Sequence, residues 1–224
     1  MPPIQDITIP TPEGDIYGTL ALPTGAAGLV VFAHGSGSSR FSPRNQEVAG
    51  ALRSTGFGTF LFDLLTESEE EVDRRTREHR FDIPMLGQRL ILATDWLRGH
   101  PGIRNLAVGY FGASTGAAAA LIAAAERPDA RAVVSRGGRP DLARDALERV
   151  QAPTLLIVGE HDEQVIDLNR AAQRRLAGAS DLVIISGATH LFEEPSTLEA
   201  AAEAARDWFI AHLRAARRSS SPVP

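Results

Sequence analysis

The sequence predicts an α/β protein with a mostly parallel, doubly wound sheet flanked by helices. Apolar runs of strand length alternate with longer helix-forming stretches, and most of these runs end at Gly, Asp or Ser. The chain has 224 residues and is 43% hydrophobic, enough for one buried core but short for two domains. We therefore expect one domain over residues 1–215, followed by a disordered tail over 216–224.

Eight strands are expected. "ITIP" and "IYGTLALP" form an antiparallel pair across the turn "PEGD". The six later strands are "GLVVFAHG", "GTFLFDLL", "LAVGYFGAS", "ARAVVSRGG", "PTLLIVGEHD" and "DLVIISGAT". Continuous apolar runs of this length are typical of parallel strands that are buried on both faces of the sheet.

Helices are expected at about 44–55, 82–99, 115–126, 139–149, 164–177 and 197–215. In "RFDIP", Asp82 caps the second of these and Pro84 lies in its first turn. The charged run 67–80, "ESEEEVDRRTREHR", indicates a solvated face, with a mobile rim over the site as the alternative. No segment is long enough to form a large cap domain.

Composition excludes several classes of function. The net charge of −5 argues against a nucleic-acid partner. The chain has no cysteine and no lysine, which removes thiolate nucleophiles, Cys-bound metals, Schiff bases and P-loops. The glycines at 109, 112 and 116 do not form a dinucleotide fingerprint, so we expect no cofactor and no metal. The start lacks a signal peptide and no run could span a membrane, which favours the cytoplasm.

The stretch "GYFGASTGAAAAL" contains Gly112-Ala113-Ser114-Thr115-Gly116, which fits the pattern G-x-S-x-G. In this pattern the serine occupies a strained strand-to-helix turn and exposes its hydroxyl group, while the flanking glycines relieve crowding. The helix that follows points its N-terminus at the serine. The pattern also arises by chance in Gly- and Ala-rich chains, but its place between a strand and a helix favours a nucleophile.

A serine nucleophile needs a base and a group that orients the base. His190 follows the last predicted strand, and an acidic residue precedes it in the chain order that this architecture requires. The run "GEHDEQV" offers Glu160, Asp162 and Glu163, of which Asp162 is best placed at the end of its strand. We therefore expect a triad of Ser114, His190 and Asp162.

The backbone N–H groups of Thr115 and Ser36 are the expected oxyanion hole, because "FAHGSGSSR" allows a sharp turn beside the nucleophile. Gly35, Gly37 and Arg136 are the expected contacts to substrate. An arginine near a site can grip a carboxylate, although a local ion pair with an acid such as Asp141 would explain an arginine here equally well.

The motifs "HGSGSSRFSPRN", "GYFGASTGAAAAL", "SRGGRPDLA", "LLIVGEHDE" and "GATHLFEEP" together resemble the dienelactone hydrolase-like group of α/β-hydrolases over nearly the whole chain. The resemblance implies an α/β-hydrolase fold and a triad at Ser114, Asp162 and His190. It differs in one respect, because dienelactone hydrolase itself carries a cysteine nucleophile and this chain has none.

These observations predict a serine hydrolase that acts on a small-molecule ester, lactone or thioester through an acyl-enzyme. Acyl transfer would use the same residues. A catalytically silent binding protein of this fold is a further alternative, which the intact Ser, Asp and His set disfavours. The natural substrate and the oligomeric state stay open.

Overall fold

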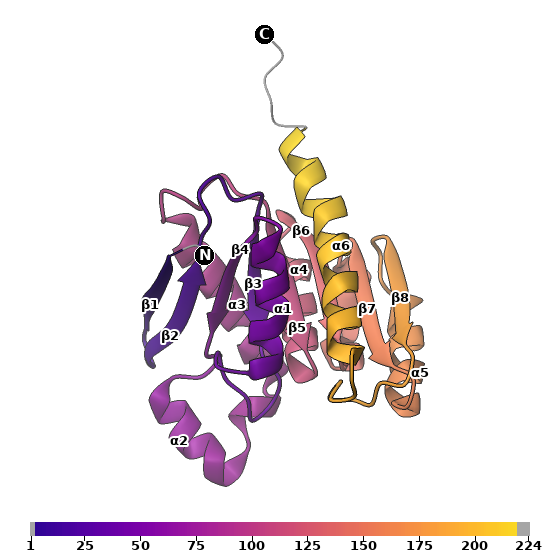
Figure 1. Ribbon diagram of the computed structural model, residues 1–224. Coiled ribbons are helices and arrows are strands. Elements are labelled where there is room, and N and C mark those ends of the chain that lie inside the picture. Colours follow the sequence, from indigo (N-terminus) through magenta and orange to yellow (C-terminus); the bar gives the residue numbers. More distant parts are fainter. Residues whose placement is uncertain (1–2, 219–224) are drawn as a thin grey trace.

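The computed structural model describes residues 3–218 and contains one eight-stranded sheet (Figure 1). The strands are β1 (Ile4–Thr11), β2 (Gly14–Ala21), β3 (Leu29–Ala33), β4 (Gly58–Phe62), β5 (Val108–Ala113), β6 (Ala130–Arg136), β7 (Thr154–Gly159) and β8 (Ser180–Ile185). Their order is β1-β2-β4-β3-β5-β6-β7-β8. All eight strands coincide with the runs predicted from the sequence.

The sheet is parallel from β4 to β8, whereas β1 and β2 are antiparallel at one edge. Every residue of β3, β4, β5 and β7 is buried. This explains why these strands are continuous apolar runs, since helices cover both faces of the parallel part. The carboxyl ends of the parallel strands meet at one edge, where loops converge.

The helices form two layers, one on each face of the sheet (Figure 1). On one face, α1 (Pro43–Ser54) packs beside α6 (Thr197–Arg218). The other face is covered by α3 (Ile83–Arg98), α4 (Thr115–Glu126), the 3-10 segment η2 (Pro140–Arg149) and α5 (Glu163–Gln173). Each layer has its own core cluster against the sheet, so the sheet is held from both sides.

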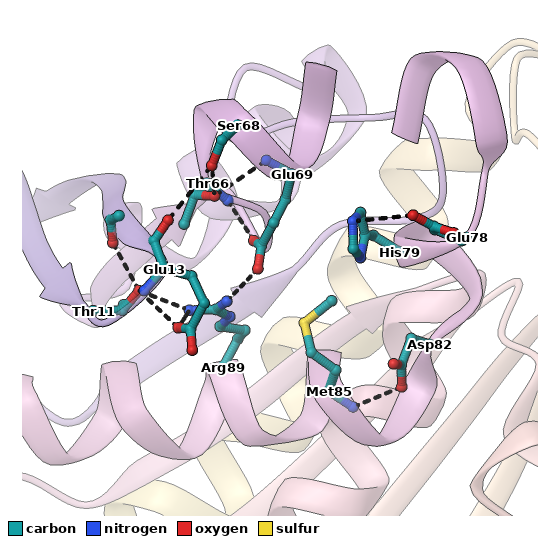
Figure 2. Close-up of polar contacts among 11 residues, drawn as sticks. Thr11, Glu13, Thr66, Ser68, Glu69, Glu78, His79, Asp82, Met85 and Arg89 are labelled. Atoms are coloured by element: carbon teal, nitrogen blue, oxygen red, sulfur yellow. Dashed lines mark hydrogen bonds and ion pairs between the residues drawn. The ribbon is translucent and has the colours of Figure 1, made fainter. Parts of the chain in front are cut away.

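Three predicted helices differ from the structure in detail. The helix expected at 164–177 is α5, which ends at Gln173. The predicted helix at 139–149 is η2, a 3-10 segment interrupted at Arg144, whose φ of 49° and ψ of −123° are not helical. The last helix extends to Arg218 rather than 215, so the start of the predicted tail is helical, and residues 219–224 lie outside the described residues. The expected cap at Asp82 is confirmed, because its carboxylate accepts the Met85 N–H at 3.1 Å (Figure 2).

The charged run 67–80 forms a helix that the sequence analysis did not predict, α2 (Glu67–Thr76), followed by the short 3-10 turn η1 (His79–Phe81). Thr66 begins α2 with a capping box: its hydroxyl accepts the Glu69 N–H at 3.3 Å and the Glu69 carboxylate accepts the Thr66 N–H at 2.8 Å. Arg89 of α3 then donates to the Glu69 carboxylate at 2.5 Å and to the Thr11 hydroxyl at 3.0 Å (Figure 2). These bonds tie the start of α2 to α3 and to the β1–β2 turn.

Asp73 and Arg80 fix the other end of α2. The side chain of Asp73 is only 1% exposed and accepts the Arg80 Nε–H at 2.5 Å and the Arg80 backbone N–H at 2.9 Å. The helix is therefore attached at both ends, although most of its residues face solvent. Within residues 3–218, no helix is both long enough and apolar enough to cross a membrane.

Candidate active site

Ser114 lies in the turn between β5 and α4, with a φ of 51° and a ψ of −121°. A non-glycine residue adopts this conformation at an energetic cost and only where its surroundings impose it. Here the Ser114 N–H donates to the Arg136 carbonyl at 3.2 Å, and the Ser114 carbonyl accepts the N–H groups of Ala117 and Arg139, both at 3.1 Å. Neighbouring backbone therefore holds the strained residue in place.

The two glycines of the G-x-S-x-G pattern are required by close backbone contacts. A Cβ atom at Gly112 would overlap the backbone of Ala117, and one at Gly116 would overlap the carbonyl oxygens of Ala33 and His34. The first turn of α4 therefore lies directly against the end of β3. This contact brings the loop after β3 next to Ser114.

The structure brings Ser114, His190 and Asp162 together from the ends of β5, β8 and β7. The Ser114 Oγ lies 3.5 Å from His190 Nε2, at the long limit of a hydrogen bond. His190 Nδ1 lies 2.6 Å from Asp162 Oδ2. When Nδ1–H donates to this carboxylate, Nε2 is free to accept the serine proton.

The other two acidic candidates take no part in this chain of hydrogen bonds. The Glu160 carboxylate accepts the Gly187 N–H at 2.7 Å and the Ser186 hydroxyl at 2.8 Å, and these bonds lower the pKa of Glu160. Glu163 is exposed at the start of α5. Only Asp162 of the three reaches the imidazole.

Two hydrogen bonds that the sequence analysis did not predict support the turn carrying His190. The Glu194 carboxylate accepts the Thr189 hydroxyl at 2.6 Å and the Thr189 N–H at 3.1 Å. Phe192, at a φ of 56°, is 2% exposed and anchors the same turn in the core. Glu194, four residues after His190, is visible in "THLFEE", but in a loop this spacing does not predict a hydrogen bond.

The loop after β3 lies beside the serine. A Cβ atom at Gly35 would lie 3.1 Å from the Ser114 Cβ. The Ser36 N–H, an expected oxyanion donor, donates to the Thr115 hydroxyl at 2.8 Å. Ser36 would therefore have to share or exchange this bond to bind an oxyanion, whereas the Thr115 N–H, at the first position of α4, has no partner within that helix. Gly37, at a φ of 69°, faces the Arg80 guanidinium rather than the cavity at Ser114.

His34 fixes the same loop to the end of β4. Its Nδ1 lies 2.9 Å from the Gly35 carbonyl oxygen, and its Nε2 accepts the Leu64 N–H at 3.1 Å. Desolvation, opposed by the bond to Gly35, lowers the pKa of His34. The imidazole is therefore held neutral, with the proton on Nδ1.

A cavity of about 210 Å³ contains Ser114 and His190. Gly35, Ser36 and Ser38 form one side of it, and Arg44, Asn45 and Arg136 line another part. A larger cavity of about 560 Å³ lies beyond Ser38, between Tyr17, Phe41 and the exposed face of α2. The run 67–80 thus supplies one wall of a cavity next to the site. No group of three or more His, Asp or Glu side chains within residues 3–218 is arranged to hold a metal ion.

The order and direction of the strands, with a strained serine in the turn after β5, define an α/β-hydrolase fold, and residues 3–218 contain no separate cap domain. The dienelactone hydrolase family model matches residues 16–215, and the chain belongs to this family. The resemblance inferred from the motifs is therefore confirmed.

Solved structures agree with this assignment. The crystal structure of dienelactone hydrolase from Anabaena variabilis is 56% identical, with a TM-score of 0.93 over 95% of this chain and 99% of that chain. Est1E from Butyrivibrio proteoclasticus has a TM-score of 0.77 at 16% identity, over 92% of this chain and 98% of its own. At that identity the likeness to Est1E shows the fold alone.

The curated relatives carry a different kind of name. Proteins from two strains of Mycobacterium tuberculosis, provisionally named phosphoribosyl transferases, are 55% identical over 215 residues. The match covers 95% of this chain but only 48% of those proteins. The chain therefore spans about half the length of the curated relatives it matches.

Proposed function

We propose that this chain is a serine hydrolase that cleaves a small ester, lactone or thioester through an acyl-enzyme. The observation that carries the proposal is the chain of contacts from Asp162 through His190 to a strained Ser114 at the N-terminus of α4. A serine hydroxyl in this setting has a base to take its proton and a helix N-terminus beside the developing oxyanion.

In the proposed reaction, Ser114 attacks the substrate carbonyl while His190 Nε2 takes the hydroxyl proton. Asp162 holds the imidazole through Nδ1 and stabilises the imidazolium. The Thr115 N–H, with Ser36 as the second donor, stabilises the tetrahedral oxyanion. His190 then protonates the leaving group, and the acyl-enzyme is hydrolysed by water that the same imidazole activates.

Hydrolysis is favoured over transfer to another acceptor because water reaches the base: the His190 side chain is 39% exposed. The name phosphoribosyl transferase belongs to proteins about half of whose length lies outside the match to this chain. A serine, an aspartate and a histidine in this chain order are typical of acyl chemistry, so we do not extend that name to this chain.

A fluorophosphonate reagent tests the assembled site without knowledge of the substrate, because it reacts with a serine that has both a base and an oxyanion hole. Intact-mass and peptide analysis should find one adduct, on Ser114, that is absent in Ser114→Ala and forms far more slowly in His190→Ala. Ser38→Ala and His161→Ala are matched controls and should label normally. Adduct formation on another serine, or none on the folded protein, would overturn the proposal.

A further inference from the structure

The larger cavity, of about 560 Å³, takes no part in the proposed chemistry, but it adjoins the cavity that contains Ser114. Ser38 lines both cavities, so a substrate whose ester group lies at Ser114 can extend past Ser38 into the larger one. The volume of the larger cavity is typical of pockets that hold small ligands. The side chains that line it therefore indicate the chemistry of the more distant part of the substrate.

One wall of the larger cavity is a stack of a guanidinium group and aromatic rings. The Arg40 guanidinium lies 4.2 Å from the ring centre of Phe41 and 5.9 Å from that of Tyr17. Asp63 fixes Arg40 twice, because its carboxylate accepts the Arg40 backbone N–H at 2.8 Å and forms an ion pair with the guanidinium. Phe41 is nevertheless 64% exposed. An exposed ring that its neighbours hold in place can pack against the C–H groups of a ligand.

Another wall of the larger cavity is the exposed face of α2, which is rich in hydrogen-bonding groups. The side chains that line the cavity from this helix are Glu67, Glu70, Glu71 and Arg74. Glu70 and Arg74 lie 3.9 Å apart in a largely exposed pair, so their charges are only weakly engaged. Ser38 and Ser39 add hydroxyl groups, which both donate and accept. The lining thus offers acceptors and donors at several points.

This lining disfavours three kinds of ligand. A long apolar chain would leave most of the polar groups unpaired. An anion would meet the glutamates of α2, and Arg40 is already paired with Asp63. A cation would meet Arg40 and Arg74, and Arg40 already lies over the aromatic rings. A neutral molecule with several hydroxyl groups avoids these conflicts, because carboxylates accept its O–H groups and guanidinium groups donate to its oxygens.

We propose that the larger cavity binds a neutral polyhydroxylated group, an open-chain polyol or a sugar ring, of the ester that Ser114 attacks. This rests on the proposed function for the attack and on the lining of the larger cavity for the binding. A hydrogen bond from a hydroxyl group to a carboxylate is stronger than one to a neutral acceptor. The carboxylates of Glu70 and Glu71 are therefore the main determinants of selection.

Two series of esters test the proposal, because the polyol can lie on either side of the ester bond. The acyl series is methyl gluconate, methyl hexanoate and methyl 6-aminohexanoate, which share one carbon chain. The alcohol series is 6-O-acetylglucose, (tetrahydropyran-2-yl)methyl acetate and acetylcholine. In at least one series, kcat/KM divided by the rate constant of alkaline hydrolysis should be about tenfold higher for the polyhydroxylated ester than for the other two. No such preference in either series, or a preference for a cationic ester, would overturn the proposal.

Glu70→Ala combined with Glu71→Ala should remove most of the preference, chiefly through KM, because the hydroxyl groups lose their acceptors. Glutamine at both positions keeps an acceptor oxygen and should retain part of it. Glu203→Ala combined with Asp207→Ala, at exposed positions of α6, changes the net charge equally and should keep the full preference. A preference that survives both alanine changes in α2 contradicts the assignment of this cavity.

A binding measurement separates this proposal from the proposed function. Saturation-transfer NMR on the Ser114→Ala protein should detect methyl gluconate or 6-O-acetylglucose without turnover, and the signal should disappear when Glu70→Ala and Glu71→Ala are added. If the wild-type protein cleaves none of the esters but this binding is present, the hydrolase proposal fails and the polyol site stands. If no ester is cleaved and no such binding is found, the polyol site fails as well.

Discussion

Replacing Arg136 by methionine should stabilise the protein, because the fold disfavours the charge of this arginine. Arg136, at the end of β6, is only 7% exposed, and its desolvation and the nearby charge of Arg44, opposed by Glu47, lower its pKa from the usual range of arginine to about 10. This shift corresponds to about 3 kcal/mol by which folding disfavours the cation. The sign follows from linkage: a base whose pKa falls on folding costs stability at every pH below its folded pKa, so the full cost is present at neutral pH. Methionine has a similarly long, unbranched side chain and carries no charge.

Two losses reduce this gain. The hydrogen bond that Arg136 Nη2 donates to the Asn45 side chain at 3.3 Å is worth about 1 kcal/mol. The cation–π contacts of the guanidinium with Phe111 and Phe192, at 5.9 and 5.8 Å from the ring centres, are together worth about the same. We therefore expect Arg136→Met to raise the free energy of unfolding by about 1 kcal/mol, or the melting temperature by roughly 2–4 °C for a chain of this size.

Urea unfolding at pH 7.5, followed by circular dichroism, measures this difference. Arg139→Met is the control, and since its ion pair with Asp141 is partly exposed the change should stay within about 0.5 kcal/mol. A methionine variant that is less stable by 1 kcal/mol or more would refute the reasoning, because Arg136 would then be a net stabilising residue.

Three further outcomes are expected. Asp162→Asn should lower kcat by about 10⁴-fold while Glu160→Gln changes it little, and steady-state kinetics showing the reverse would transfer the orienting role to Glu160. The kcat/KM of esters should decline from acetyl and butyryl to decanoyl, since most side chains that line the larger cavity are polar or charged; a steady rise with chain length would contradict this. Because the pKa of His34 is lowered on folding, the unfolded chain binds a proton more readily, and the protein should lose stability as the pH falls below about 6.5. In urea unfolding, the free energy of unfolding should therefore fall less on acidification in His34→Gln than in the wild type.

The sheet was predictable because its strands are buried on both faces. Runs such as "GLVVFAHG" and "PTLLIVGEHD" are almost entirely apolar until the strand ends, with Thr154 at the start of β7 as the exception. The polar residues that follow these strands necessarily meet at one edge of a parallel sheet. Ser114, Asp162 and His190 were for this reason nominated from their order along the chain, and their geometry is consistent with that expectation.

Contacts between distant parts of the chain were not predictable in the same way. The helix α2 has few apolar residues, and its ends are fixed by the capping box at Thr66 and by Arg89 and Arg80, whose partners are chosen by the fold. The burial of Arg136 was equally unpredictable from the sequence. Asp141 lies close to Arg136 in sequence but pairs with Arg139, and within residues 3–218 no acid forms an ion pair with Arg136.

The exposed face of α2 can change in sequence without loss of the bonds that hold the helix. The contacts that fix the helix lie at its two ends, whereas Glu67, Glu70, Glu71 and Arg74 face the larger cavity and make only weak pairs or none. Substitutions at these four positions can thus change the charge of one cavity wall while the anchoring bonds and the sheet stay intact. In a directed-evolution library, randomising these four positions should change which small molecules enter the larger cavity with little loss of folded protein.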